Sequence, residues 1–105
     1  MPSIDSLEKL IGTPRDGALL RYSLGVEYAR AGDLARAALE LREALARDPG
    51  YSAAWKALGK TLEQSALPAE ALAAYRSGIE AARGKGDRQA EKEMTVFARR
   101  LERRG

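Results

Sequence analysis

Apolar residues recur along most of the chain at intervals of three and four positions, the spacing that puts them on one face of an α-helix. This pattern predicts helices over residues 3–11, 14–31, 34–47, 51–65, 68–82 and 88–104. The stretches between them carry glycine, proline and acidic residues, which end one helix and cap the next. Alanine, leucine, arginine and glutamate are abundant in the sequence, and all of them favour helix. We therefore expect an all-α protein with short turns.

The second pair of long helices repeats the first at a distance of 34 residues, with Gly25 matched by Gly59, Leu24 by Leu58, and Ala37 by Ala71. Two helices with one apolar face each cannot bury those faces alone, so stacking a second pair completes the core. Small residues are expected where paired helices approach most closely. Trp55 is expected in the core. Residues 18–85 are thus predicted to contain two copies of one helix-pair unit.

The two ends of the chain are predicted to cover the open ends of this array. Residues 3–11 form a short amphipathic segment, and residues 88–104 carry Ala90, Met94 and Leu101 on a single apolar stripe. An array of repeats needs such one-sided helices at its ends. The predicted organisation of the single domain 1–105 is an N-terminal cap segment (1–13), a first repeat (14–50), a second repeat (51–85) and a C-terminal capping helix (86–105).

The repeated positions resemble the tetratricopeptide repeat pattern, Trp-x2-Leu-Gly-x2-Tyr followed by Ala-x3-Phe/Tyr, Ala and Pro. The first copy reads Arg21-x2-Leu24-Gly25-x2-Tyr28, Ala37-x3-Leu41, Ala44, Pro49. The second reads Trp55-x2-Leu58-Gly59-x2-Leu62, Ala71-x3-Tyr75, Gly78, with Arg83 in place of the last proline. This resemblance covers 68 of 105 residues. It implies a right-handed α-solenoid of two helix-turn-helix repeats, similar to small stand-alone bacterial members of the family.

In this family the first helix of each repeat lines a concave groove that receives a peptide or a helix of another protein. The resemblance therefore implies a groove formed by Leu19, Tyr22, Val26, Arg30, Ala53, Lys56, Lys60 and Gln64. Half of this set is apolar, and most of the other half is basic. The matching partner is a protein segment with an apolar anchor beside acidic residues. Lys56 and Lys60 lie one turn apart, either to grip a carboxylate or as two solvated lysines.

The residues of the family's carboxylate clamp are missing, because Tyr22, Val26 and Ala57 stand where lysine and asparagine are required. Chaperone C-terminal tails are therefore disfavoured as partners. The chain also contains no cysteine and no histidine. Their absence removes the common metal ligands and the imidazole base of catalytic triads, so we expect neither an enzyme nor a cofactor or metal site. With no signal-like start and no apolar run of membrane-spanning length, the cytoplasm is expected, without membrane association.

Two other functions remain open from the sequence. Exposed apolar groove residues could pair between copies, which would give a self-associating structural module, although a monomer is the favoured expectation. The net charge is +3, and the segment from Arg83 to Gly105 is its main source, with eight basic and four acidic residues. Its basic end (Arg99, Arg100, Arg103, Arg104) could contact nucleic acid. No platform of aromatic side chains accompanies it, so a nucleic-acid partner is disfavoured.

Overall fold

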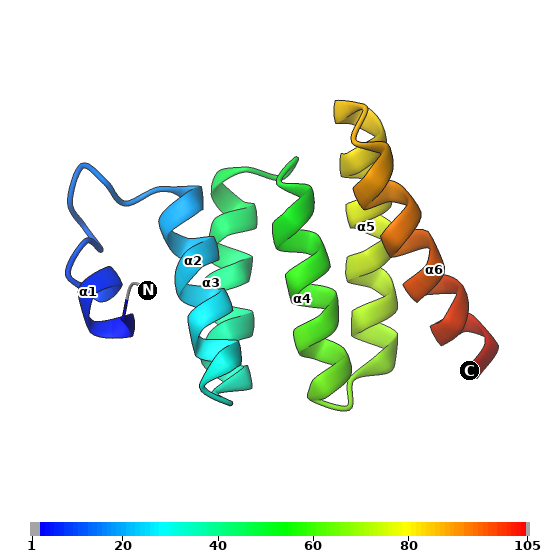
Figure 1. The fold of residues 1–105 in the computed structure, drawn as a ribbon, viewed down its shortest axis with the longest axis horizontal. Coiled ribbons are helices and arrows are strands. Elements are labelled where there is room, and N and C mark those ends of the chain that lie inside the picture. Colours follow the sequence, from blue (N-terminus) through cyan, green and yellow to red (C-terminus); the bar gives the residue numbers. More distant parts are fainter. Residues whose placement is uncertain (1–2, 105) are drawn as a thin grey trace.

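The computed structural model describes residues 3–104, which contain six helices and no strand. The helices are α1 (Ile4–Glu8), α2 (Ala18–Arg30), α3 (Leu34–Arg47), α4 (Ser52–Gln64), α5 (Pro68–Lys85) and α6 (Arg88–Arg104). Helices α2 to α6 stand side by side and run alternately up and down (Figure 1). This is the stacked arrangement of an α-solenoid, so the all-α prediction is confirmed.

The turns between the long helices follow the predicted chemistry. Gly32 adopts a left-handed conformation (φ +84°) after α2, and the Asp33 carboxylate then accepts the backbone N–H of Arg36 to start α3. Gly86 ends α5 in the same way (φ +71°), and Asp87 accepts the N–H of Ala90 at the start of α6. Left-handed backbone is readily adopted by glycine, and an acidic cap satisfies a free N–H.

Three predicted helix boundaries were wrong. The segment 3–11 is helical only to Glu8, and the helix expected from residue 14 begins at Ala18. Between them the chain folds into turns, in which the Thr13 hydroxyl donates to the Leu10 carbonyl and the Asp16 carboxylate accepts the N–H of Gly12. Asp16 therefore stabilises this turn, and α2 begins only after it. Helix α5 runs three residues past the predicted end at 82, because the left-handed residue is Gly86 and not Gly84.

Two glycines create the closest contacts between paired helices, as expected from the repeat. A Cβ atom on Gly25 would lie 2.6 Å from Cγ of Leu41, and one on Gly59 would lie 2.3 Å from a ring carbon of Tyr75. Leu41 and Tyr75 are both fully buried. Each pair of helices thus packs a large side chain of its second helix directly against the backbone of its first.

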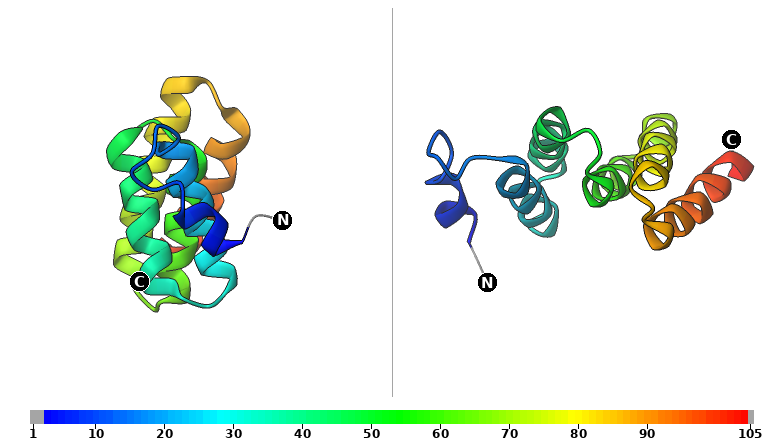
Figure 2. Two further views of the ribbon diagram at one scale, coloured as in Figure 1. Left: turned by 90° about the vertical axis from the view of Figure 1, so that its left-hand side faces the viewer. Right: turned by 90° about the horizontal axis from the view of Figure 1, so that it is seen from above.

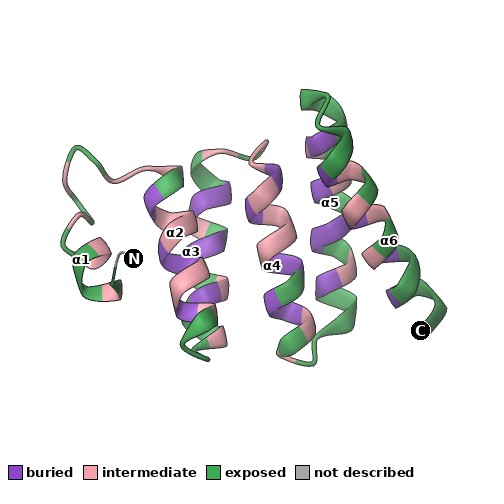
Figure 3. Cartoon of the chain, in the orientation of Figure 1, coloured by how far each residue is buried: buried purple, intermediate pink, exposed green. Residues whose placement is uncertain are grey.

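Burial follows the inner surfaces of the stacked helices (Figure 3). The larger core cluster joins α3, α4, α5 and α6, and a smaller one joins α2 to Ala37 of α3, with Ile4, Leu7 and Leu10 of the N-terminal segment packed on it. Trp55, which was expected in the core, packs against the larger core cluster but is not enclosed by it. Its side chain is only half-buried, and its indole N–H donates to the Pro49 carbonyl at 2.8 Å. Within residues 3–104, no helix is long and apolar enough to cross a membrane.

Candidate functional site

Helices α2, α4 and α6 form one layer of the molecule, and α3 and α5 form the other, as the view from above shows (Figure 2). The first helix of each pair therefore lies on a common surface, which we call the α2–α4–α6 face. The eight predicted groove residues all come from α2 and α4.

A hollow of about 280 Å³ lies between α2 and α4. Its lining consists of small and apolar residues with polar ends at the rim: Gly25, Val26, Ala29, Arg30, Leu41, Ala57, Lys60, Thr61 and Gln64. Four of the predicted groove residues, Val26, Arg30, Lys60 and Gln64, thus meet at one place. Because Gly25 has no side chain, the hollow reaches the buried Leu41. We refer to it as the α2–α4 hollow.

The other four predicted residues lie outside this hollow. Leu19 is largely exposed, with 68% of its surface accessible, and Ala53 is half-buried on α4. The ring of Tyr22 packs against that of Tyr51 with 5.0 Å between centroids. This aromatic contact joins α2 to the residue that precedes α4. Tyr22 therefore already has a packing role within the protein.

Lys56 and Lys60 are not equivalent, although both were predicted to face the groove. The Lys56 ammonium lies 3.3 Å from the Glu93 carboxylate of α6. The Lys60 ammonium lies over the ring of Phe97, 5.3 Å from its centroid, and has no carboxylate partner among residues 3–104. A cation held by an aromatic ring can still accept an anionic ligand on its open side. Lys60 is therefore the better candidate for recognition of an acid.

Helix α6 contributes a wall of this face that the sequence reasoning missed. Phe97 lies between two cations, Lys60 and Arg100, whose charged groups are 5.3 and 5.4 Å from its centroid. Arg100 is itself held by Glu63 of α4 at 3.0 Å. Because residues 88–104 were interpreted only as a cap, their contribution to this face was not predicted. Continuing the 34-residue period beyond α4 would have placed a third first helix close to where α6 begins.

An ion-pair cluster ties the first repeat to the segment before it. Arg21 donates to Asp16 and to Glu40, each at 2.9 Å, and all three side chains are largely buried. The hydrogen bond from Arg21, aided by the Gly12 N–H, lowers the pKa of Asp16 to about 2. These charges satisfy one another, so the cluster has a structural role. Among the described residues no group of histidine, cysteine, aspartate or glutamate could hold a metal ion.

A second, larger hollow of about 820 Å³ lies away from the predicted groove, where the end of α6 meets the start of α5. Leu72 and Leu101 form part of its apolar lining. Arg76 and Glu102 pair across its edge at 3.0 Å. Glu63, another lining residue, is paired with Arg100. Most charges at its rim are thus neutralised within the molecule, in contrast to Lys60.

Comparison with known proteins gives consistent results for sequence and structure. A family model described as "Tetratricopeptide repeat" matches residues 18–61. The chain is 48% identical over 100 residues to the TPR repeat-containing protein PA0015 of Pseudomonas aeruginosa, covering 95% of both proteins.

Among solved structures, protein BPP2914 of Bordetella parapertussis superposes with a TM-score of 0.82 at 44% identity, covering 96% of this chain and 88% of that one. A tetratricopeptide repeat domain protein of Salinibacter ruber superposes with a TM-score of 0.77 at 29% identity, covering 85% and 89%. Both likenesses extend over nearly the whole of the molecule.

Proposed function

Because the chain belongs to the tetratricopeptide repeat family, we propose that it is a protein-interaction scaffold that binds a peptide or a helix of a partner on its α2–α4–α6 face. The observation that supports this most is the α2–α4 hollow, where four predicted groove residues meet. The proposed role is non-catalytic and needs no cofactor. A cytoplasmic location, expected from the sequence, is part of the proposal.

The α2–α4 hollow suits a single apolar side chain of the partner. Its volume of about 280 Å³ is at the lower limit of pockets for drug-sized molecules, roughly 300–1,000 Å³. Val26 and Ala57 give it apolar walls, and the buried Leu41 forms its floor. An anchoring side chain inserted there would exchange contact with water for contact with apolar atoms, which is the main source of affinity in such grooves.

The rim of the hollow favours an acidic residue next to the anchor. Lys60 has no carboxylate partner among the described residues and lies at the edge of the hollow, while the neighbouring Lys56 is neutralised by Glu93. A glutamate or aspartate about one turn from the anchor would reach Lys60. Such a rim contact adds specificity and speeds association more than it adds affinity.

A matched pair of alanine-to-leucine substitutions tests whether the hollow receives the anchoring side chain. Peptides are first selected from a displayed random library against the wild-type protein, and their affinity is measured by fluorescence anisotropy. Ala57→Leu fills the hollow and should weaken binding about tenfold or more, the effect expected for losing one well-buried anchor. Ala46→Leu adds the same side chain at an exposed position of α3, in the other layer of the molecule, and should change affinity less than twofold. Equal effects of the two variants would contradict the proposal.

A second pair of variants tests whether Lys60 binds an acidic residue of the partner. Lys60→Gln should weaken binding of an acidic peptide about threefold, as expected for one exposed ion pair. Lys56→Gln removes a lysine already held by Glu93 at 3.3 Å, and it should have the smaller effect. If Lys56→Gln proves the more damaging change, the proposed role of Lys60 is wrong.

We also propose that the protein acts as a monomer. Among residues 3–104, the exposed large apolar residues are Ile11, Leu19, Leu39, Leu67 and Val96. They belong to different helices and turns and do not form the contiguous apolar patch that self-association needs. Sedimentation equilibrium at increasing concentration should give the monomer mass throughout. A dimer at micromolar concentration would favour self-association.

A further inference from the structure

Helix α6 carries its acidic and its basic side chains on different sides. Its three glutamates turn toward neighbouring helices and are paired there: Glu91 with Arg83, Glu93 with Lys56, and Glu102 with Arg76. Its apolar stripe of Ala90, Met94, Ala98 and Leu101 is buried. The helix therefore uses all its negative charge for packing within the molecule.

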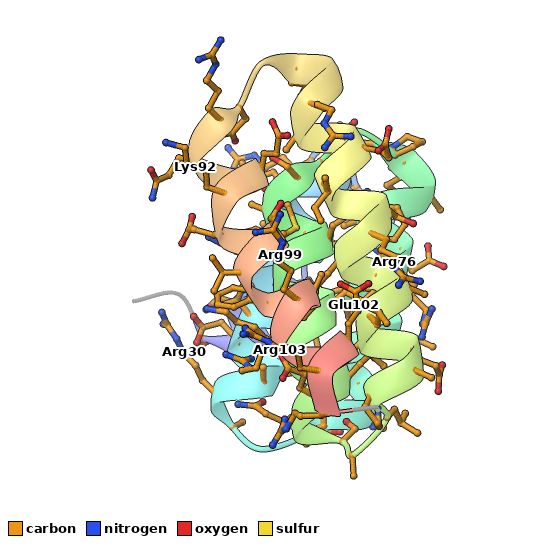
Figure 4. The ribbon with its side chains drawn as sticks, turned by 90° about the vertical axis from the view of Figure 1, so that its right-hand side faces the viewer. Arg30, Arg76, Lys92, Arg99, Glu102 and Arg103 are labelled. Atoms are coloured by element: carbon orange, nitrogen blue, oxygen red, sulfur yellow. The ribbon has the colours of Figure 1, made fainter. Side chains whose placement is uncertain are left out.

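The opposite side of α6 is a row of cations. Arg88, Lys92, Arg99 and Arg103 are exposed, and their side chains have no ion pair or hydrogen bond with any residue of the described chain. Figure 4 looks onto this side and shows Lys92, Arg99 and Arg103 along the helix, with Arg76 and Glu102 meeting beside it. Val96, 59% exposed, lies in the middle of the row. We call these five residues the basic row.

The structure separates this row from the basic end considered in the sequence. Of the four arginines expected there, Arg100 is held by Glu63 and lies on the α4 side. Arg99 and Arg103 instead join Arg88 and Lys92, which precede them by whole turns of the helix. The row thus extends over most of the 17-residue helix, a length of about 25 Å.

We propose that the basic row is a second docking surface, which binds an acidic amphipathic helix of a partner protein. The cations follow one another at intervals of four, seven and four residues, the repeat with which side chains of a facing helix meet. Acidic side chains at the same spacing would pair with them. Because this spacing reads the same in both directions, the partner helix can lie parallel or antiparallel to α6.

Val96 favours a protein helix over nucleic acid as the occupant. An apolar side chain in the centre of the row contributes nothing to a phosphate backbone, but it gives a facing helix an apolar contact. The aromatic residue of α6, Phe97, is already in contact with Lys60, Arg100 and Tyr75 on the inner side. It is therefore not available on this side for stacking with bases.

The proposal goes beyond the groove function, because the row and the α2–α4 hollow share no residue. Its test uses a synthetic helical peptide of about 20 residues, long enough to span α6. Glutamates are placed at the spacing of the cations, with a central leucine on a background of alanine and glutamine. The protein should bind this peptide at low salt, and should not bind a version with glutamine in place of each glutamate.

Matched variants then localise the binding. Arg99→Gln combined with Arg103→Gln should weaken binding about three- to tenfold, as expected for two exposed ion pairs. Lys9→Gln combined with Arg15→Gln removes two other exposed cations without a side-chain partner in the described chain and should change affinity less than twofold. Equal losses would show non-specific attraction and overturn the proposal, as would a failure to bind the glutamate peptide.

A third comparison distinguishes helix from nucleic acid. Val96→Ser should weaken binding of the peptide about threefold and leave any binding of single-stranded poly(dT) unchanged. If poly(dT) binds more tightly than the peptide, and loses affinity only when the cations are removed, the surface is a nucleic-acid site and the proposal is wrong. Ala57→Leu should leave peptide binding to the row intact, so that failure of the groove proposal and failure of this one remain distinguishable.

Discussion

The two repeats have the same register but hold their helices together by different interactions. At the position where the family pattern has tryptophan, the first repeat places Arg21 between Asp16 and Glu40, and the second places Trp55, hydrogen-bonded to the Pro49 carbonyl. The Arg21 side chain is largely buried, and that of Trp55 is half-buried. A position at the edge of the core can therefore be filled either by a satisfied ion-pair cluster or by an aromatic ring.

The two repeats also differ in the residues that they contribute to the α2–α4 hollow. Residues 34 positions apart line it together, and the apolar Val26 of α2 corresponds to the basic Lys60 of α4. Likewise the aromatic Tyr22 corresponds to Lys56. At these two positions the first repeat is apolar or aromatic and the second is basic, a combination that a pair of identical repeats could not provide.

The largest difference between the repeats should appear at their buried second-helix residues. Tyr75→Ala should lower the free energy of unfolding by about 4 kcal/mol and Leu41→Ala by about 3 kcal/mol, because the larger side chain leaves the larger cavity. Both residues are fully buried. Urea denaturation followed by circular dichroism measures both changes. Tyr75→Phe, which keeps the ring, is the folded control, and a greater loss for Leu41→Ala would contradict the ranking.

Substitution of the glycines that face these two residues should lower stability in the same order, with the larger loss in the second repeat. Gly59→Ala brings a methyl group against the rigid ring of Tyr75 and should cost about 2 kcal/mol, after the gain in helix propensity. Gly25→Ala meets the more adaptable Leu41 and should cost about 1 kcal/mol. Thermal unfolding of the two single variants compares them directly. Gly84→Ala, in exposed helix with no atom close to the new methyl group, should be neutral or stabilising.

The turns within the repeats provide a smaller test. Gly32 and Ala66 occupy equivalent positions, and both have positive φ, +84° and +60°. Ala66→Gly should therefore stabilise the protein by about 0.5–1 kcal/mol, and Gly32→Ala should destabilise it by about 1 kcal/mol. Unfolding midpoints in urea give both values. A loss of stability in Ala66→Gly would show that the alanine side chain matters more than the backbone strain.

The smallest expected effect is a dependence of stability on acidic pH that arises from the first repeat. Arg21 lowers the pKa of Asp16 from 3.8 to about 2. Because the folded-state pKa is below the unfolded one, the stabilisation is fully present above about pH 4 and is lost as the pH falls through 2. Asp16→Asn should flatten this part of the stability curve. Asp5→Asn, on α1, should retain the wild-type slope, and an unchanged slope in Asp16→Asn would argue against the ion-pair cluster.

The repeat period predicted the helical fold and the close approach of paired helices at Gly25 and Gly59, because each depends on residues within one or two helices. It could not show that Asp16 turns back to Arg21 and delays the start of α2, since that depends on a contact formed only in the folded chain. Burial of Trp55 was overestimated for a related reason. Its position in the pattern shows that it contacts the core, but not how much of it remains exposed.

The predicted groove residues stay a hypothesis whose geometry is now clearer. Sequence register placed Val26 and Lys60 on the same surface, but it could not tell that Lys56 is neutralised by Glu93. That pair joins α4 to α6, and the sequence showed α6 only as a cap. The apolar stripe of α6 shows which side of the helix is buried, but not which residues lie next to its other sides. The contacts of α6 with α4 and α5 could therefore not be predicted from the sequence.

The central claim, that a partner segment anchors in the α2–α4 hollow, is tested most directly by amide chemical-shift mapping of the ¹⁵N-labelled protein during titration with a selected peptide. We predict that the largest shifts occur at Val26, Ala57, Lys60 and Gln64, and that the exposed side of α3, including Leu39, is unaffected. Shifts confined to α3 and α5, with Val26 and Ala57 unchanged, would contradict the account.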